Sequence, residues 1–133
     1  MLKLIPFATY SYTLFVIVAS LAKLVFTFMP KGVPNSDKIG HLIAYFGFAI
    51  IWSLYFFVKN KQNTKAVFLK SVLKAAVFGV FFGMLMELAQ LTLTDYRQFD
   101  MKDALANTLG VLLAVLLMYC FANFIILIKK RAN

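Results

Sequence analysis

Charged residues are scarce in this sequence, and acidic residues are the scarcest of them. Only 14% of the 133 residues are charged, with five acidic residues against 14 basic ones. Hydrophobic residues make up 62% of the chain, a share that a water-soluble domain of this length rarely reaches. The composition therefore argues against a soluble fold and favours a protein that is solvated by lipid.

Cysteine and histidine each occur once. Because Cys120 is the only cysteine, no intramolecular disulfide can form. Zinc sites usually show closer clustering of histidine and cysteine than His41 and its distant carboxylates provide, so we expect no metal site. The chain also lacks a glycine-rich phosphate loop, a dinucleotide fingerprint and a haem motif, and we expect no cofactor.

The hydrophobic residues fall in four long blocks. They occupy residues 4–28, 39–58, 72–93 and 104–128. Each block is near or above the ~20 residues that a helix needs to cross the hydrocarbon core, and none shows the alternation of a β-barrel strand. The connections are too short for a separate soluble domain. We therefore predict a single all-α integral membrane domain over residues 1–133, built as a bundle of four transmembrane helices.

The first block has an alternative interpretation as a signal peptide. Lys3 precedes the apolar run, and Ser20-Leu21-Ala22 offers the small residues of a cleavage site. The run continues past that site and is longer than a typical signal-peptide core, so a transmembrane helix is the preferred interpretation.

Basic residues are distributed unevenly between the two sides of this bundle. One side holds Lys3, Lys59, Lys61, Lys65, Lys70, Lys74, Lys129, Lys130 and Arg131. The other side holds Lys31, Lys38, Arg97 and Lys102, with Lys23 in the outer part of the first helix, together with all five acidic residues. Because basic residues resist translocation, we expect the first side and both termini to be cytoplasmic. The expected location is a bacterial inner (cytoplasmic) membrane, crossed several times.

The net charge of +9 then belongs to the cytoplasmic rim, where anionic lipid would attract it. A nucleic-acid-binding protein would instead carry a basic face interleaved with base-reading residues. We therefore expect membrane lipid as a partner and no nucleic acid.

Polar residues follow one face of the second predicted helix. Asp37, His41 and Tyr45 recur every four residues and share that face, which begins at the outer interface. Asp37 is also an ordinary helix-capping residue. An imidazole one turn inside the membrane needs a partner, which can be Asp37 or a residue of another helix.

The third predicted helix carries Gly79, Gly83, Glu87 and Gln90 on a single stripe. The two glycines form a GxxxG pair, which indicates close helix packing. An ionisable group such as Glu87 is costly in lipid and normally faces a partner or a wet cavity, so it is a candidate functional residue.

The fourth predicted helix repeats this pattern with Asp103, Asn107, Gly110 and Ala114. In the loop before it, Arg97 has a planar fork that suits a carboxylate partner or an anionic ligand. Three helices thus place polar residues at the outer end and small residues below them, which predicts a shallow outward-facing polar pocket. A buried hydrogen-bond network that only holds the bundle together is the alternative.

The residues expected to bind a ligand in this pocket are Asp37, His41, Tyr45, Glu87, Gln90, Arg97, Asp103 and Asn107. Among them, His41, Glu87 and Asp103 are the candidates for catalytic acid–base chemistry. The sequence offers no obvious nucleophile beside them.

These residues, over positions 35–115, resemble the VanZ-like family. The resemblance rests on Asp37-Lys38 with His41 and Tyr45, then the E-x-x-Q pair, the arginine, and the D-x-x-x-N-x-x-G motif that begins at Asp103. It implies a membrane protein related to a prototype that is associated with low-level resistance to the glycopeptide teicoplanin. The family resemblance names no reaction.

Two functions from different classes fit these observations. In the first, the protein binds or senses a cell-envelope amphiphile, lipid-linked or glycopeptide-like, and contributes to glycopeptide antibiotic tolerance. In the second, it is an intramembrane enzyme that modifies an envelope lipid or cell-wall precursor by His/Glu/Asp acid–base chemistry. The missing nucleophile favours binding. A small transporter is a third interpretation, weakened by the lack of inverted repeats, and a homo-oligomer could supply what one chain lacks.

Overall fold

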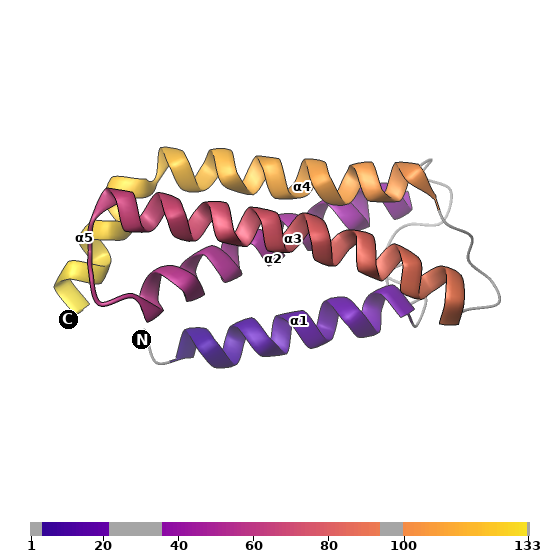
Figure 1. Ribbon diagram of the computed structural model, residues 1–133, viewed down its shortest axis with the longest axis horizontal. Coiled ribbons are helices and arrows are strands. Elements are labelled where there is room, and N and C mark those ends of the chain that lie inside the picture. The colour runs from indigo at the N-terminus through magenta and orange to yellow at the C-terminus, as the bar shows by residue number, and fades with distance from the viewer. Residues whose placement is uncertain (1–3, 22–35, 94–99, 133) are drawn as a thin grey trace.

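A computed structural model describes residues 4–21, 36–93 and 100–132 of the chain. Within these ranges the chain forms five helices and no strand: α1 (Ile5–Leu21), α2 (Ser36–Lys59), α3 (Lys65–Leu93), α4 (Met101–Cys120) and α5 (Ala122–Ala132) (Figure 1). Helices α2, α3 and α4 are long and apolar enough to cross a membrane, and α1 is apolar but has 17 residues. The all-helical, membrane-type fold is therefore confirmed, whereas four spans and cytoplasmic termini stay predictions.

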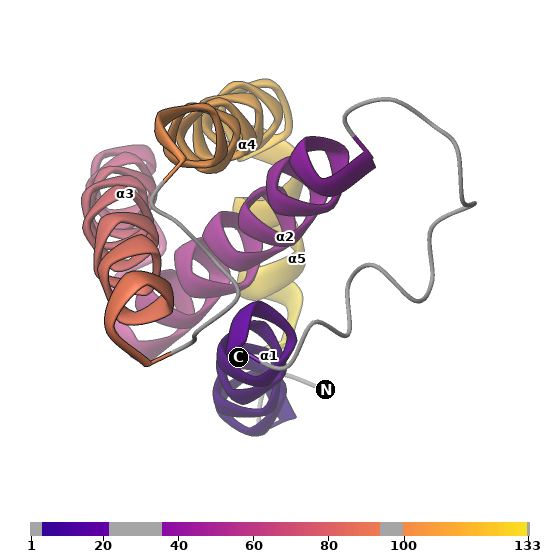
Figure 2. The ribbon, with the colours of Figure 1, turned by 90° about the vertical axis from the view of Figure 1, so that its right-hand side faces the viewer.

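The bundle has two chemically different ends. At one, which we call the polar end, α2 begins, α3 ends and α4 begins, whereas α1 begins and α5 lies at the opposite, basic end (Figure 1). Figure 2, seen from the polar end, shows α2 between α1, α3 and α4. Because α2 packs against all three of these helices, the side chain of His41 in its second turn is buried, whereas Asp37 and Lys38 at its start are partly exposed.

Glycines allow the helices to approach closely beside these residues. A Cβ atom at Gly110 of α4 would overlap the Leu42 carbonyl oxygen of α2 and lie 3.0 Å from the Phe46 nitrogen. A Cβ at Gly83 of α3 would lie 3.2 Å from the Tyr45 ring and 3.3 Å from the Asn107 Cβ. The packing role expected of the small residues is thus confirmed at both helices.

Aromatic side chains fill the middle of the bundle. Phe48 stacks on Phe82 with 4.8 Å between ring centroids, and Trp52 packs edge-on against Phe78 at 4.7 Å. The Trp52 indole also donates to the Thr13 hydroxyl at 3.1 Å, which joins α2 to α1. This layer separates the polar end from the basic end.

Helices α3 and α4 begin before the positions expected for them. Helix α3 begins at Lys65, seven residues before the expected start at 72, and the Thr64 hydroxyl accepts from the Val67 N–H at 3.3 Å as an N-terminal cap. Helix α4 begins at Met101 because the Asp100 carboxylate accepts from the Lys102 N–H. The hydrophobic pattern missed both starts, since polar side chains rather than apolar ones set them.

The expected helix over 104–128 is interrupted at Phe121 and continues as α5. Helix α5 buries Ala122, Ile126 and Lys129 on one face. The Lys129 ammonium donates to the carbonyl oxygens of Phe57 and Asn60, each at 2.7 Å, and of Gln62 at 3.3 Å. This cation holds α5 against the C-terminal end of α2, where the helix dipole favours positive charge.

Candidate functional site

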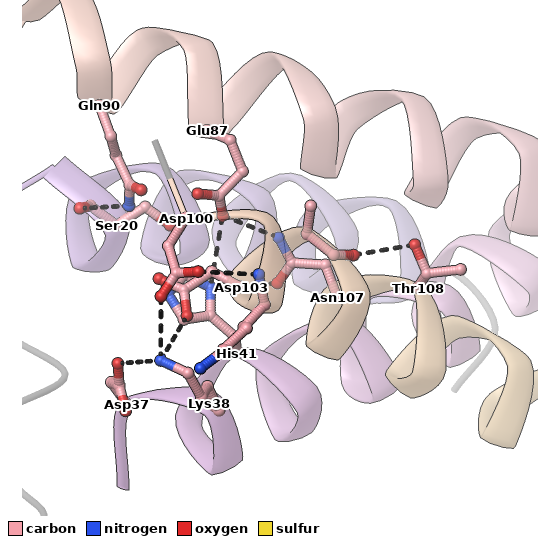
Figure 3. A network of polar contacts seen from close by, with 12 residues as sticks. Ser20, Asp37, Lys38, His41, Glu87, Gln90, Asp100, Asp103, Asn107 and Thr108 are labelled. Atoms are coloured by element: carbon pink, nitrogen blue, oxygen red, sulfur yellow. Dashed lines mark hydrogen bonds and ion pairs between the residues drawn. The ribbon is translucent and has the colours of Figure 1, made fainter. Parts of the chain in front are cut away.

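Four polar side chains meet where α2, α3 and α4 converge at the polar end (Figure 3). We call them the polar cluster: His41 from α2, Glu87 from α3, and Asp103 and Asn107 from α4. Their exposed fractions are 8%, 1%, 7% and 2%, respectively. Polar groups at such depth must be compensated by one another, because neither lipid nor the apolar core can do so.

A hydrogen-bond relay links the three helices through Asn107. The Asn107 Nδ2 donates to Glu87 Oε1 at 3.1 Å, and its Oδ1 lies 3.0 Å from His41 Nδ1 (Figure 3). Because the carboxylate can only accept and the amide nitrogen can only donate, Oδ1 is the acceptor and His41 Nδ1 carries a proton. The other ring nitrogen, Nε2, faces Asp103 Oδ2 at 3.6 Å.

A lysine covers the outer side of the cluster. The Lys38 ammonium lies 2.7 Å from Asp37, 3.2 Å from Asp100 and 3.2 Å from Asp103 (Figure 3). The Lys102 backbone N–H, which donates to Asp100, holds the pKa of that carboxyl below its usual value. Lys38 therefore joins α2 to the start of α4 and orients Asp103, whose second oxygen faces the histidine.

The structure brings together most of the residues that the sequence pattern selected, and of the two partners considered for His41 it shows the one from other helices. Asp37 contacts Lys38, whereas His41 is paired with residues of α3 and α4. Lys38 is not among the residues that the sequence pattern selects for the site, although it belongs to the Asp37-Lys38 pair of the family resemblance. A feature of the sequence does distinguish Lys38: it is the one lysine that directly follows an acidic residue at a helix start.

Gln90 and Tyr45 lie at the edges of the cluster. The Gln90 amide donates to the Ser20 carbonyl oxygen at 3.0 Å and so ties α3 to α1 (Figure 3). Tyr45 is 1% exposed, and its hydroxyl has no hydrogen-bond partner among the described residues. Arg97, the remaining expected ligand-binding residue, lies outside the described residues.

The cluster is equipped to hold or transfer a proton and to hold a cation. Glu87 Oε1 lies 3.9 Å from His41 Nδ1, so the imidazole stands between two carboxylates of different helices. An imidazolium at this position would be stabilised by both of them. The expected roles of His41, Glu87 and Asp103 as acid–base residues stay predictions.

A groove runs along the outside of the α2–α4 contact, next to the cluster. It encloses about 270 Å³. Its lining consists of apolar side chains and two lysines: Lys38, Ile39, Leu42, Lys102, Leu105, Ala106 and Leu109. The lysines belong to the first turns of the two helices, so the groove is apolar along its length and cationic at the polar end.

Comparison with known proteins places the chain in a family. The uncharacterized protein C11E3.10 of Schizosaccharomyces pombe is 36% identical over 85 residues, which are 64% of this chain and 48% of that protein. The chain thus spans about half the length of this curated relative. No solved structure matches. The VanZ/LLP1 family model matches residues 1–125, and the chain therefore belongs to the VanZ/LLP1 family.

Proposed function

We propose that this chain binds a membrane amphiphile at the polar end, with the anionic head group beside Lys102 and an acyl chain in the α2–α4 groove. The observation that carries the proposal is the groove itself, which is apolar along its length and has lysines at one end. An amphiphile has the matching distribution of polarity. A lipid-linked or glycopeptide-like envelope molecule is the form of ligand that would affect glycopeptide tolerance.

The apolar wall of the groove can favour one acyl chain over another only through its shape, because hydrophobicity does not distinguish the groove from the surrounding lipid. Leu105 and Leu109 are more than half exposed and face the space that lipid occupies. An acyl chain gains no hydrophobic free energy on moving there from lipid, so only packing and the head group can make the binding specific. The polar end must therefore supply the selectivity.

Lys102 is the cation best placed to supply it. Lys38 is surrounded by three carboxylates, which balance its charge. Lys102 is exposed in the first turn of α4 and forms no ion pair with any residue that the structure describes. An ammonium at this place can bind a phosphate or carboxylate head group as a point charge.

Lipid retention by the purified protein tests this proposal. The protein is placed in nanodiscs of phosphatidylglycerol and phosphatidylcholine, and native mass spectrometry counts the lipids that stay bound. We expect preferential retention of phosphatidylglycerol, reduced at least several-fold by Lys102→Gln and by Leu109→Trp, which fills the groove. Leu116→Trp is the matched control, because Leu116 is 60% exposed against 53% for Leu109 and does not line the groove. Equal retention by all variants would refute the proposal.

An intramembrane enzyme is the second candidate function, and the relay through Asn107 favours it. A histidine whose tautomer is set by a neighbour and whose second nitrogen faces a carboxylate is arranged as a general acid or base. Lipid mass spectrometry of deletion and overexpression strains separates the two functions. A covalent change in one defined lipid that is lost in Glu87→Gln would establish the enzymatic function. If no lipid changes covalently, the binding function is the one supported.

Substitutions at three of the residues selected from the sequence test the contribution to drug tolerance. We expect Glu87→Gln, His41→Ala and Arg97→Lys each to abolish any drug-tolerance phenotype while leaving the amount of protein in the membrane unchanged. A phenotype that survives all three substitutions would disconnect the polar end from tolerance.

A further inference from the structure

Three ionisable side chains of the polar cluster converge on one small space. His41, Glu87 and Asp103 are all buried, and one ligand atom from each lies within 4.8 Å of the others. We propose that these three residues bind one divalent transition-metal ion, with Zn²⁺ and Mn²⁺ as the ions that suit them best. The proposal goes beyond amphiphile binding and does not depend on it.

The spacing of the ligand atoms suits such an ion. Zinc lies about 2.0–2.2 Å from histidine nitrogen and carboxylate oxygen, so two ligand atoms on one ion are at most about 4.3 Å apart. His41 Nε2 and Asp103 Oδ2 are 3.6 Å apart and already satisfy this limit. Glu87 has the longest side chain of the three and can close the remaining distance by rotating about its side-chain bonds.

Two neighbours orient the ligands as outer partners do in known metal sites. A histidine that binds metal through one nitrogen usually donates its other N–H to an oxygen, and here Nδ1 donates to Asn107 Oδ1. Lys38 holds Asp103 Oδ1 and leaves Oδ2 on the side of the histidine. His41 Nε2 and Asp103 Oδ2 therefore already face the same space in the protein without a bound ion.

An independent observation at Tyr45 points to a missing hydrogen-bond acceptor or donor at this position. The Tyr45 hydroxyl is buried without a partner among the described residues, and burying an unpaired hydroxyl is unfavourable. The Tyr45 ring and the Asn107 side chain both border Gly83, one turn before Glu87 on α3. The Tyr45 ring therefore lies near the proposed ligand Glu87. A water molecule on the ion would give the Tyr45 hydroxyl the partner that it lacks among the described residues.

The buried carboxylates of the cluster also favour a cation. Glu87 and Asp103 are 1% and 7% exposed, respectively. Burying carboxylates is costly within a membrane, and a divalent ion beside them would offset that cost. One imidazole nitrogen with two carboxylates suits Zn²⁺ or Mn²⁺ better than Ca²⁺ or Mg²⁺, which prefer oxygen ligands alone. Three protein ligands leave a position for water or for an anionic ligand.

Metal content of the full-length protein tests the site. The protein is purified in detergent, stripped with EDTA, incubated separately with ZnCl₂ and MnCl₂, and desalted before elemental mass spectrometry. We expect about one ion per chain of at least one metal. Asp103→Asn and Glu87→Gln should each weaken binding by at least about tenfold, since even outer partners of metal ligands contribute that much.

Asp100→Asn is the matched control. It removes the same charge from beside Lys38, yet Asp100 is not one of the proposed ligands, and asparagine preserves the helix cap. Binding by Asp100→Asn should equal that of the wild type. Size-exclusion profiles and helical circular dichroism identify any variant that fails to fold, and the visible spectrum of bound Co²⁺ then reports the ligands in the wild type itself. Negligible metal in the folded wild type, or equal losses in Asp100→Asn and Asp103→Asn, would overturn the proposal.

Discussion

Asn107 provides the most direct test of how the polar cluster holds the bundle together. Its amide makes two buried hydrogen bonds to different helices, one of them to a carboxylate. Interhelical hydrogen bonds in membranes contribute about 0.6 kcal/mol on average and up to about 1.7. Replacing Asn107 by leucine, which has a similar volume, should therefore lower the free energy of unfolding by about 1–3 kcal/mol.

Asn107→Asp should be more damaging than Asn107→Leu. The new carboxylate cannot donate to Glu87 and would place a like charge where the amide lies 3.1 Å from Glu87 Oε1. At that distance and an effective dielectric constant of about 20, the repulsion is about 5 kcal/mol, an upper bound that protonation would reduce. The destabilisation should accordingly be smaller at low pH, where one of the two carboxylates is protonated.

The assay is reversible unfolding in mixed detergent micelles, followed by circular dichroism. Thr108→Val is the control, because the Thr108 hydroxyl donates only to the Ala104 carbonyl oxygen of its own helix, at 2.9 Å. Its loss should change the free energy of unfolding by less than about 0.5 kcal/mol. If Asn107→Leu were no more destabilising than Thr108→Val, the relay would not contribute to stability and the reasoning above would be wrong.

Three further predictions concern other parts of the fold. Gly110→Ala should reduce the yield of folded protein and its thermal stability, because the added methyl group meets the α2 backbone, which cannot move as a side chain can. Lys129→Met should cost about 1–3 kcal/mol in unfolding experiments, since three carbonyl groups at the end of α2 lose a charged donor, whereas Lys130→Met, at an exposed position, should cost almost nothing. In cells, a membrane-impermeant thiol reagent should label a cysteine placed at Gln98 and spare one at Gln62 in a chain without Cys120, and the reverse pattern would invert the proposed orientation.

Much of the architecture follows from the sequence, because lipid imposes a simple rule. Apolar blocks of about 20 residues can be satisfied in hydrocarbon only as helices or closed barrels. The same rule singles out Glu87 and His41, since an ionisable group inside such a block requires a partner. The boundaries were harder to predict, because Thr64 and Asp100 begin their helices through single hydrogen bonds that leave no trace in hydrophobicity.

The pairing of these polar residues was decided only by the tertiary structure. Spacing along one helix places His41 near Asp37, yet the histidine is paired across the bundle, while Asp37 is bound by Lys38. Helix periodicity determines which residues share a face, but it does not determine the rotation of one helix against another. That rotation is set by close contacts such as Gly110 against the α2 backbone. For the same reason, a histidine and two carboxylates that are far apart in the sequence meet within one metal-sized space.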